Sequence, residues 1–378
     1  QSSDLLCFCY CRLQSLKTRL LVAIRCLDIG GAEKQVLEFV RLVDKSRFDV
    51  CLATMYGGVM EDDAKKIEGV KYVNLGKKGR FDVFGFLFDY ALLINEFAPD
   101  TVFSHIGEMN LFSLWARPLA SKKFKLVWTL HSAFVDYRSY GFFFRLLFWL
   151  QKVLSRFVDK IVCVSRSAYE YHEEAGYDMR RAVTVYNGVD TQFFAPSREF
   201  GEVFRVQNNI PQDAFVIGIA ARIDRMKGYP LLAVAARELL SKHDNIVFVA
   251  AGGGDEAIKN ECIEILGEYA TRFIWLGFVA DLRGFYSCLN LFCLPSYGEA
   301  FGLTVAEAMS CGIPAVVSDA GDMRIIVGDE RAVFKSGDTR DLATKLEWAM
   351  REAVPNRERI VQNFDIGSSV ANTSKELI

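Results

Sequence analysis

The chain has 378 residues, of which 51% are hydrophobic and 24% are charged, and its formal net charge is −2. This length predicts two domains of ordinary size, each able to bury its own core. The slightly acidic balance, without a zinc-finger spacing or an RNA-binding signature, argues against nucleic acid as a partner.

Strand-then-helix patterns recur from Lys17 to about Val185 and again from Phe215 to about Met350. Several expected strands are continuously hydrophobic, as parallel strands covered on both faces are. The alternation predicts an α/β protein built from two Rossmann-like units. We expect domains at residues 1–190 and 191–357, joined in the turn-rich stretch 187–197, with 358–378 as a last helical segment.

Two strand ends stand out in the first half of the chain. Gly30 and Gly31 follow the expected strand 20–27 and open a helix, where glycine lets a ligand approach the backbone closely. His131 follows the apolar strand 125–130, so it is expected at the edge of the sheet where α/β proteins bind ligands. The alternative for His131 is an ordinary structural histidine.

An aromatic and basic stretch covers residues 137–157, with the sequence YRSYGFFFRLLFWLQKVLSRF. Basic groups beside aromatic ones suit the surface of an anionic membrane, and the run is too short and too interrupted to span a bilayer. The first 190 residues also carry a net positive charge, whereas the remainder is net negative. These features favour a peripheral membrane contact through the amino-terminal domain, with a plain core helix as the alternative.

The ten cysteines fall mostly singly in expected strands or near helix ends, which is typical of reduced thiols in a cytoplasmic protein. Cys7, Cys9 and Cys11 alternate and could share one face of a strand, but partner ligands for a metal are missing. The apolar segment around them is too short for a secretion signal. No strict Asp-x-Asp pair occurs, and the four histidines lack metal-ligand spacing. We therefore expect no metal.

Basic and glycine-rich turns follow two expected strands in the second half. Arg222 closes the expected strand 215–222 and Lys227 follows it before a helix, so two cations are expected at a ligand-binding sheet edge. Such cations suit a phosphate-bearing ligand, because Arg222 can take two oxygens and Lys227 acts as a point charge. Gly252 lies in a comparable turn after the strand 245–250. A solvated pair of surface cations is the alternative.

The most informative stretch is SYGEAFGLTVAEAMSCGIP, residues 296–314. Phe301, Gly302 and Leu303 stand where backbone N–H groups would be offered at a helix start, which attracts phosphate. Gly312 and Pro314 mark the end of this helix. Glu299 on the loop and Glu307 inside the helix could hold two ends of an extended ligand. A solvated Glu299 and a helix-surface Glu307 are the alternatives.

The run PSYGEAFGLTVAEAMSCGIPAVVSD resembles the signature of the retaining family-4 glycosyltransferases, the glycosyl transferases group 1. Other landmarks follow in the family's order, with LDIGGAEKQ, WTLHS, VYNGVD, ARIDRMKG and AGGGDE. One departure comes after SDAGD, where Met323 and Arg324 replace a short acidic segment. The resemblance implies the GT-B fold, with two Rossmann-like domains facing each other across a cleft and a C-terminal helix crossing back to the first domain.

The resemblance also implies transfer of a sugar from a UDP- or GDP-type nucleotide-diphosphate sugar, with retained configuration and no cofactor. The acceptor would be a saccharide or a lipid-linked molecule, in cell-surface polysaccharide or glycolipid synthesis at the inner face of the cytoplasmic membrane. The implied catalytic residues are Glu299, Arg222, Lys227 and His131. The implied donor-binding residues are Glu307, Gly30, Gly31, Phe301, Gly302, Leu303, Gly252, Gly277 and Phe278.

Three alternatives use the same phosphate-binding features. A nucleotide-sugar epimerase would change the sugar without an acceptor, and a phosphorylase of GT-B shape would need inorganic phosphate. A noncatalytic scaffold would keep the fold only to bind partners. The presence of both glutamates and both cations argues against a scaffold.

Overall fold

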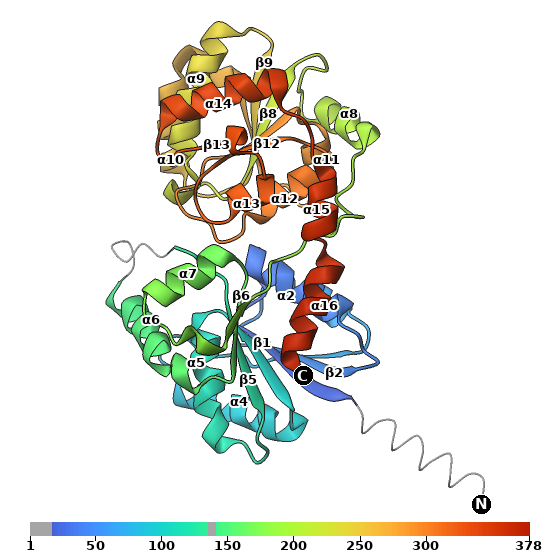
Figure 1. The fold of residues 1–378 in the computed structure, drawn as a ribbon, viewed down its shortest axis with the longest axis vertical. Coiled ribbons are helices and arrows are strands. Elements are labelled where there is room, and N and C mark those ends of the chain that lie inside the picture. Colours follow the sequence, from blue (N-terminus) through green and yellow to red (C-terminus); the bar gives the residue numbers. More distant parts are fainter. Residues whose placement is uncertain (1–16, 135–140) are drawn as a thin grey trace, which may run out of the picture. The chain divides into compact units, whose positions relative to one another are not determined.

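The computed structural model describes residues 17–134 and 141–378 (Figure 1). The expectations about Cys7, Cys9 and Cys11 fall outside these ranges. The chain divides into two compact units: unit 1 runs to Tyr186 and regains Gly367–Ile378, and unit 2 is Asn187–Ile366. The expected divisions, after residue 190 and after residue 357, stand close to these positions without coinciding with them.

Unit 1 contains a parallel sheet of seven strands in the order β3-β2-β1-β4-β5-β6-β7. Its strands are β1 Thr18–Ile24, β2 Phe48–Thr54, β3 Val70–Asn74, β4 Thr101–His105, β5 Lys125–Leu130, β6 Lys160–Cys163 and β7 Ala182–Thr184. Its helices are α2 Gly31–Leu42, α3 Glu61–Lys65, α4 Phe84–Phe97, α5 Gly107–Ala116, α6 Phe142–Leu154, α7 Arg166–Glu174 and α16 Ile366–Leu377, with 3₁₀ turns η1 Arg117–Leu119, η2 Ser155–Phe157 and η3 Met179–Arg181.

Unit 2 contains a parallel sheet of six strands in the order β10-β9-β8-β11-β12-β13. Its strands are β8 Phe215–Ala220, β9 Ile246–Ala251, β10 Phe273–Gly277, β11 Leu291–Leu294, β12 Ala315–Ser318 and β13 Val333–Phe334. Its helices are α8 Arg198–Gln207, α9 Tyr229–Lys242, α10 Glu256–Leu266, α11 Leu282–Ser287, α12 Leu303–Ser310, α13 Met323–Val327, α14 Thr339–Glu352 and α15 Arg357–Asn363, with 3₁₀ turns η4 Arg225–Lys227, η5 Gly267–Arg272 and η6 Glu330–Ala332.

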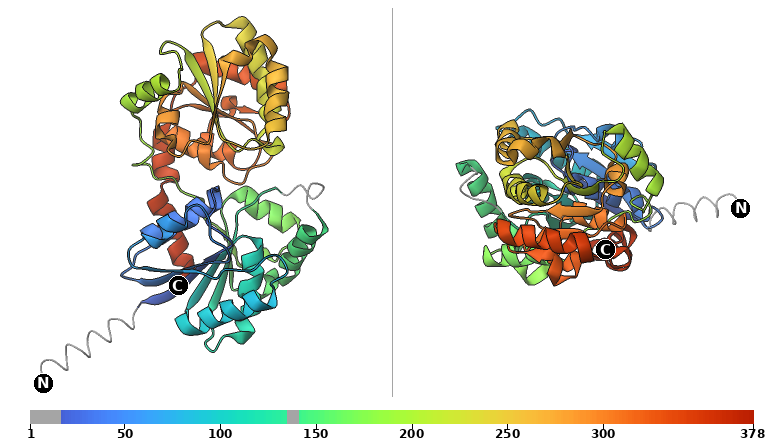
Figure 2. Two further views of the ribbon diagram at one scale, coloured as in Figure 1. Left: turned by 180° about the vertical axis from the view of Figure 1, so that it is seen from behind. Right: turned by 90° about the horizontal axis from the view of Figure 1, so that it is seen from above.

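The two sheets share one topology, which confirms the expected pair of Rossmann-like units. In each sheet the first strand is central, the chain builds outward to one edge, and the fourth strand returns to the other side of the first. Helices cover both faces of each sheet (Figures 1 and 2). The strand order therefore reverses between β1 and β4 and between β8 and β11. Ligands of open α/β sheets bind outside the carboxyl ends of the strands at such a reversal.

Large apolar side chains fill the face of the unit 1 sheet that α4 and α5 cover. Trp128 of β5, together with Phe86 and Tyr90 of α4, is fully buried in one core cluster. The hydroxyl of Tyr90 shares a 3.0 Å hydrogen bond with Ser113 of α5, so its polar end is satisfied. The rigid sheet that results holds the loops at its carboxyl edge.

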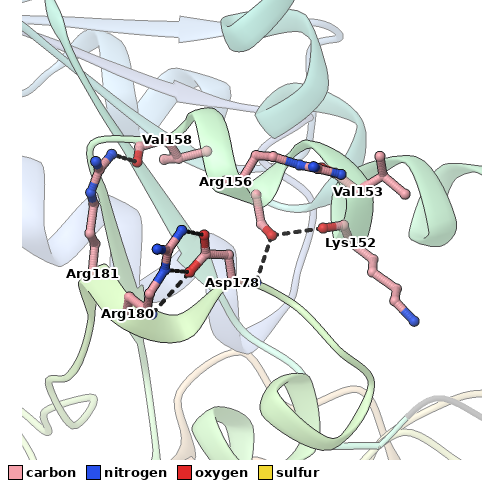
Figure 3. Close-up of polar contacts among 8 residues, drawn as sticks. Lys152, Val153, Arg156, Val158, Asp178, Arg180 and Arg181 are labelled. Atoms are coloured by element: carbon pink, nitrogen blue, oxygen red, sulfur yellow. Dashed lines mark hydrogen bonds and ion pairs between the residues drawn. The ribbon is translucent and has the colours of Figure 1, made fainter.

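The end of α6 is tied to the chain that leads into β7 (Figure 3). Ser155 donates from its hydroxyl to the carbonyl of Lys152, at 2.7 Å, and accepts from the backbone N–H of Asp178, at 2.8 Å. The guanidinium of Arg180 bonds the same Asp178 and lowers its pKa to about 2. These contacts fix the last turn of α6 although most of the helix is exposed.

The carboxy-terminal tail forms two helices, where the sequence suggested one. The break falls at Phe364 and Asp365, because Val189 pairs with Asp365 as an isolated bridge and exchanges backbone hydrogen bonds with Phe364 and Ile366. The helix α15 packs within unit 2, with Arg359 donating to the carbonyls at the end of α13. The helix α16 belongs to unit 1, as the predicted return of the last helix to the first domain requires.

Histidines with lowered pKa values make unit 1 sensitive to acid. His172 of α7 is 2% exposed, and its Nδ1–H donates to the carbonyl of Ala168, at 2.8 Å. Burial lowers its pKa from 6.5 to about 4, and burial lowers that of His131 to about 4 as well. Below about pH 6.5 these imidazoles are protonated in the unfolded chain but stay neutral in the folded chain. The free energy of unfolding of unit 1 therefore falls as the pH falls.

We expect the free energy of unfolding of unit 1 to fall by about 1.4 kcal/mol per pH unit for each such histidine between about pH 6 and pH 4.5. Urea unfolding followed by circular dichroism over this range measures the slope. His172→Asn keeps an N–H donor without the titrating group, so its slope is expected to be shallower. An equal slope in this variant would show that His172 is not a source of the acid sensitivity.

Candidate functional site

A lysine and a glutamate meet at the strand-order reversal of unit 2. Lys227 ends η4, which follows β8, and Glu299 lies on the loop after β11. The Nζ of Lys227 bonds Oε1 of Glu299 at 2.5 Å, and both side chains are mostly buried, with 25% and 15% exposed. Ser296, fully buried, donates to the same Oε1 at 3.0 Å. Within the described chain, the second oxygen of Glu299, Oε2, accepts no hydrogen bond.

The ammonium group of Lys227 retains donors after it has bonded Glu299. A lysine has three N–H donors, and one of them is used by Oε1. The pair therefore offers a ligand both positive N–H groups and a carboxylate oxygen. The reading of Glu299 as a solvated loop residue is wrong, because the side chain is enclosed and fixed by two donors.

Arg222 lies two residues beyond the end of β8, and its side chain is 77% exposed. Asp224 Oδ2 accepts from Nε of Arg222 at 2.9 Å and lies 2.8 Å from the second guanidinium nitrogen. The other oxygen of Asp224 accepts from the backbone N–H of Lys227 at 3.2 Å. Asp224 therefore holds the guanidinium of Arg222 and the backbone of Lys227, whose ammonium group is held by Glu299. An exposed ion pair of this kind contributes only about 0–1 kcal/mol, so a phosphate can compete with Asp224 for Arg222.

Close backbone contacts explain two glycines at this edge. A Cβ on Gly252, whose φ is +147°, would lie 1.9 Å from the carbonyl oxygen of Ala221. A Cβ on Gly228, whose φ is +69°, would lie 2.0 Å from the carbonyl oxygen of Pro295. The loops after β8, β9 and β11 are thus packed backbone to backbone, which fixes the positions of Arg222 and Lys227.

The helix α12 begins as the sequence predicted. Gly302 is its N-cap, with φ of +89°, and Leu303 is its first residue. Phe301 is a core residue, 2% exposed, whose ring packs edge-on against Phe364. A Cβ on Gly302 would lie 2.8 Å from the side chain of Met323. The residue that departs from the family pattern thus packs under the start of this helix.

Glu307 lies inside α12 and is 4% exposed, so the alternative of a helix-surface charge is wrong. Its Oε2 accepts a 2.6 Å hydrogen bond from the hydroxyl of Tyr286 in α11. Burial, and next the charge of Glu307, raise the pKa of Tyr286 well above its ordinary value, so the phenol stays a donor. The carboxylate of Glu307 is therefore buried and held in place by a fixed donor.

Gly277 and Phe278 lie at the end of β10. The carbonyl of Gly277, at φ +68°, accepts from the N–H of Gly252 at 2.7 Å. The ring of Phe278 is 61% exposed. The structure therefore provides an open aromatic surface next to the Gly252 loop.

The predicted residues of unit 1 lie on the loops that follow β1 and β5. Gly30 is the N-cap of α2 and Gly31 its first residue; a Cβ on Gly31 would have nothing within 4 Å. His131 directly follows β5, and its Nε2 lies 3.0 Å from Nδ1 of His105, the last residue of β4. The four histidines are therefore not all scattered, since two of them form a hydrogen-bonded pair.

Sequence reasoning missed His105, Ser296, Asp224 and Tyr286 as members of the site. His105 and Ser296 could have been found by the signal that identified His131, a polar residue at the carboxyl end of an apolar strand. Tyr286 gives no such signal, because its contact with Glu307 depends on how α11 packs against α12. No group of three or more His, Cys, Asp and Glu side chains suited to a metal ion occurs in the part of the chain that the structure describes.

Comparison with known proteins identifies the family. The model of the glycosyl transferases group 1 matches residues 201–364, and the model of glycosyltransferase family 4 matches residues 29–193. The chain belongs to this family of glycosyltransferases. The fold and the family therefore agree with the resemblance seen in the sequence.

Individual relatives support the same family. The O-antigen biosynthesis glycosyltransferase WclY of Escherichia coli is 31% identical over 204 residues, which are 52% of this chain and 54% of WclY. The chain thus matches about half the length of such relatives. The putative glycosyltransferase EpsF of Bacillus subtilis is 20% identical over 318 residues, covering 84% of this chain and 83% of EpsF.

Solved structures show the same fold. The crystal structure of HepE from Anabaena in complex with UDP and glucose matches with a TM-score of 0.82 at 19% identity, over 95% of this chain and 99% of HepE. The chain therefore has the GT-B type of α/β fold, with two Rossmann-like domains.

Proposed function

We propose that this protein is a glycosyltransferase that moves a sugar from a nucleotide-diphosphate sugar to a saccharide or lipid-linked acceptor. The pair of Lys227 and Glu299 at the strand-order reversal of unit 2 carries the proposal. It puts N–H groups that could bind a phosphate beside a carboxylate oxygen that could accept from a sugar hydroxyl. Membership of a glycosyltransferase family supports it, and the name of WclY points to cell-surface polysaccharide as the product class.

Each residue of the unit 2 site has a role in this proposal. Arg222 and Lys227 bind the diphosphate and stabilise the negative charge that it gains as the sugar–oxygen bond breaks. Glu299 accepts hydrogen bonds from sugar hydroxyls through Oε2. Glu307, held by Tyr286, binds the ribose, and Phe278 borders the base. The N–H groups at the start of α12 add partial positive charge for the phosphates.

The same groups suit a reaction that retains the anomeric configuration. Retention by double displacement needs a carboxylate nucleophile with a second carboxyl about 5 Å away, whereas Glu299 is tied to a lysine and Glu307 to a tyrosine. We favour attack on the same face, in which the departing diphosphate accepts the proton of the acceptor hydroxyl. Because two protein cations serve the diphosphate, we propose that transfer does not require a divalent metal.

A screen of UDP- and GDP-sugars by thermal shift is expected to give one strong stabiliser, since a ligand that binds only the folded state raises its stability. With that donor and an acceptor library, transfer is expected to persist in EDTA. Conversion of the sugar without acceptor would instead indicate an epimerase, and dependence on inorganic phosphate a phosphorylase. Absence of binding by every donor would contradict the proposal and favour a scaffold.

We also propose that unit 1 contacts an anionic membrane at the cytoplasmic face through α6. This helix exposes Phe142 (80%) and Trp149 (54%) beside the exposed cations Arg145, Lys152 and Arg156. The rings of Phe81, Phe84 and Phe88 are exposed as well, and the guanidinium of Arg80 lies 5.3 Å from the ring centre of Phe143. In the described ranges no helix is long and apolar enough to cross a bilayer.

Flotation with vesicles tests the membrane contact. Vesicles of phosphatidylethanolamine with phosphatidylglycerol are expected to bind the protein, more weakly at high salt, because exposed charges are screened. The double variant Phe142→Ser, Trp149→Ser is expected to lose most binding. Phe200→Ser, which removes an exposed ring of unit 2, is the matched control. Equal binding by the α6 variant and the control would contradict this assignment.

A further inference from the structure

The two histidines at the carboxyl ends of β4 and β5 share one hydrogen bond, whose polarity determines what His131 offers a ligand. Nδ1 of His105 and Nε2 of His131 are 3.0 Å apart. Burial lowers the pKa of both imidazoles, that of His131 to about 4, so both rings are neutral near pH 7. A neutral imidazole has one N–H and one bare nitrogen. One ring therefore donates to the other, and two arrangements are available.

The surroundings of His105 distinguish the two arrangements. His105 is 3% exposed, and its Nε2 is buried without a hydrogen-bond partner among the described residues. The rings of Phe103 and His105 form a T-shaped pair with their centroids 4.2 Å apart, and a phenyl ring offers no conventional hydrogen-bond acceptor. If His131 donated from Nε2, the proton of His105 would have to lie on this buried, unpartnered Nε2. Orphaned buried N–H groups are rarer in proteins than under-satisfied acceptors.

The backbone beside His105 holds the ring in this position. Ile106 has φ of +64°, a disfavoured value for a β-branched residue. The helix α5 starts at the next residue, Gly107, and the partial positive charge at its start disfavours a cationic His105. Ser104, the residue before, is fixed by a 2.8 Å hydrogen bond to Asn110 of α5. The strand end that presents His105 is therefore locked on both sides.

We propose that His105 is a positioning residue that donates from Nδ1 to Nε2 of His131 and so fixes the tautomer of His131. The proton of His131 then lies on Nδ1, and His131 acts as a hydrogen-bond donor to an oxygen of the ligand. It does not act as a general base. The tautomer rests on the geometry of unit 1 alone, whereas its use in sugar transfer rests on the proposed function.

Long-range ¹H–¹⁵N correlation spectra of the intact, ligand-free protein test the tautomer, because the two imidazole nitrogens differ in shift when one is protonated. The His131 signals are assigned by their loss in His131→Ala. We expect a proton on Nδ1 and a bare Nε2. A proton on Nε2 of His131 would overturn the proposal, whatever the protein's activity.

Variants of His105 test the positioning role. The amide N–H of His105→Asn can replace the Nδ1–H donor, so the tautomer and most of kcat/KM are expected to persist. His105→Leu has no donor, so the His131 proton is expected to spread over both nitrogens and kcat/KM to fall about tenfold, the size of one hydrogen bond. In a His131→Ala background, His105→Leu is expected to cause no further loss of kcat/KM. A full additional loss there would show a merely structural role for His105.

Discussion

Replacing Lys227 by methionine is expected to lower kcat by on the order of 100-fold, the scale of losing one charge-stabilising donor. The change removes an ammonium group that would stabilise the leaving diphosphate, and Arg222→Ala is expected to have a similar effect. Steady-state rates with the donor identified by thermal shift measure the loss. Unchanged turnover in either variant would remove that residue from the leaving-group role.

Two controls separate this chemical loss from misfolding. Arg225→Met removes a cation from the same turn, η4, whose partner is the exposed Glu261, at 2.7 Å, and it is expected to leave kcat within about twofold, as a surface change does. Lys227→Met also leaves the carboxylate of Glu299 without its ion-pair partner, which costs stability. Adding Glu299→Gln is expected to restore the melting temperature without restoring turnover.

The substitution Gly252→Ala is expected to lower the free energy of unfolding of unit 2 by on the order of 3 kcal/mol, because it combines backbone strain with a steric clash. The new Cβ would meet the carbonyl of Ala221 at 1.9 Å, and the loop that carries Arg222 would have to move. Thermal unfolding followed by calorimetry measures the loss. Donor affinity is expected to fall with it, since Arg222, which we propose to bind the phosphates, is displaced.

The neighbouring glycine supplies a matched control for the Gly252→Ala prediction. A Cβ on Gly253 would have nothing within 4 Å, so Gly253→Ala is expected to change stability by less than about 0.5 kcal/mol. If both alanines destabilise equally, the backbone contact with Ala221 is not the reason for a glycine at 252.

Much of the fold could be predicted from local patterns. The apolar runs placed most strands, and Gly312, which has φ of +82°, ended α12 where the sequence suggested a left-handed residue. The strand β8 ends at Ala220, earlier than the sequence predicted. Ala221 continues the apolar run, but its carbonyl packs against the Gly252 loop. The break between α15 and α16 was missed because it depends on Val189, far away in the sequence.

The candidate site was likewise only partly predictable from the sequence. Arg222, Lys227, Glu299 and His131 could be found because each follows an apolar strand or lies in a family motif. Their partners could not be found, since Asp224 meets Arg222 and the backbone of Lys227 through loop geometry, and Tyr286 reaches Glu307 from another helix. Periodicity reports which face of an element is buried, but it does not report which polar groups meet across elements.

The return of α16 to unit 1 has a consequence for the order in which the protein matures on the ribosome. Unit 2 is one uninterrupted segment, so it can fold as soon as it has emerged. Unit 1 waits for its last helix: the hydroxyl of Thr101 bonds the carbonyl of Leu377, and Lys160 pairs with Glu376 at 2.6 Å. These groups of the first-made sheet stay without their final partners until the whole of unit 2 has been translated.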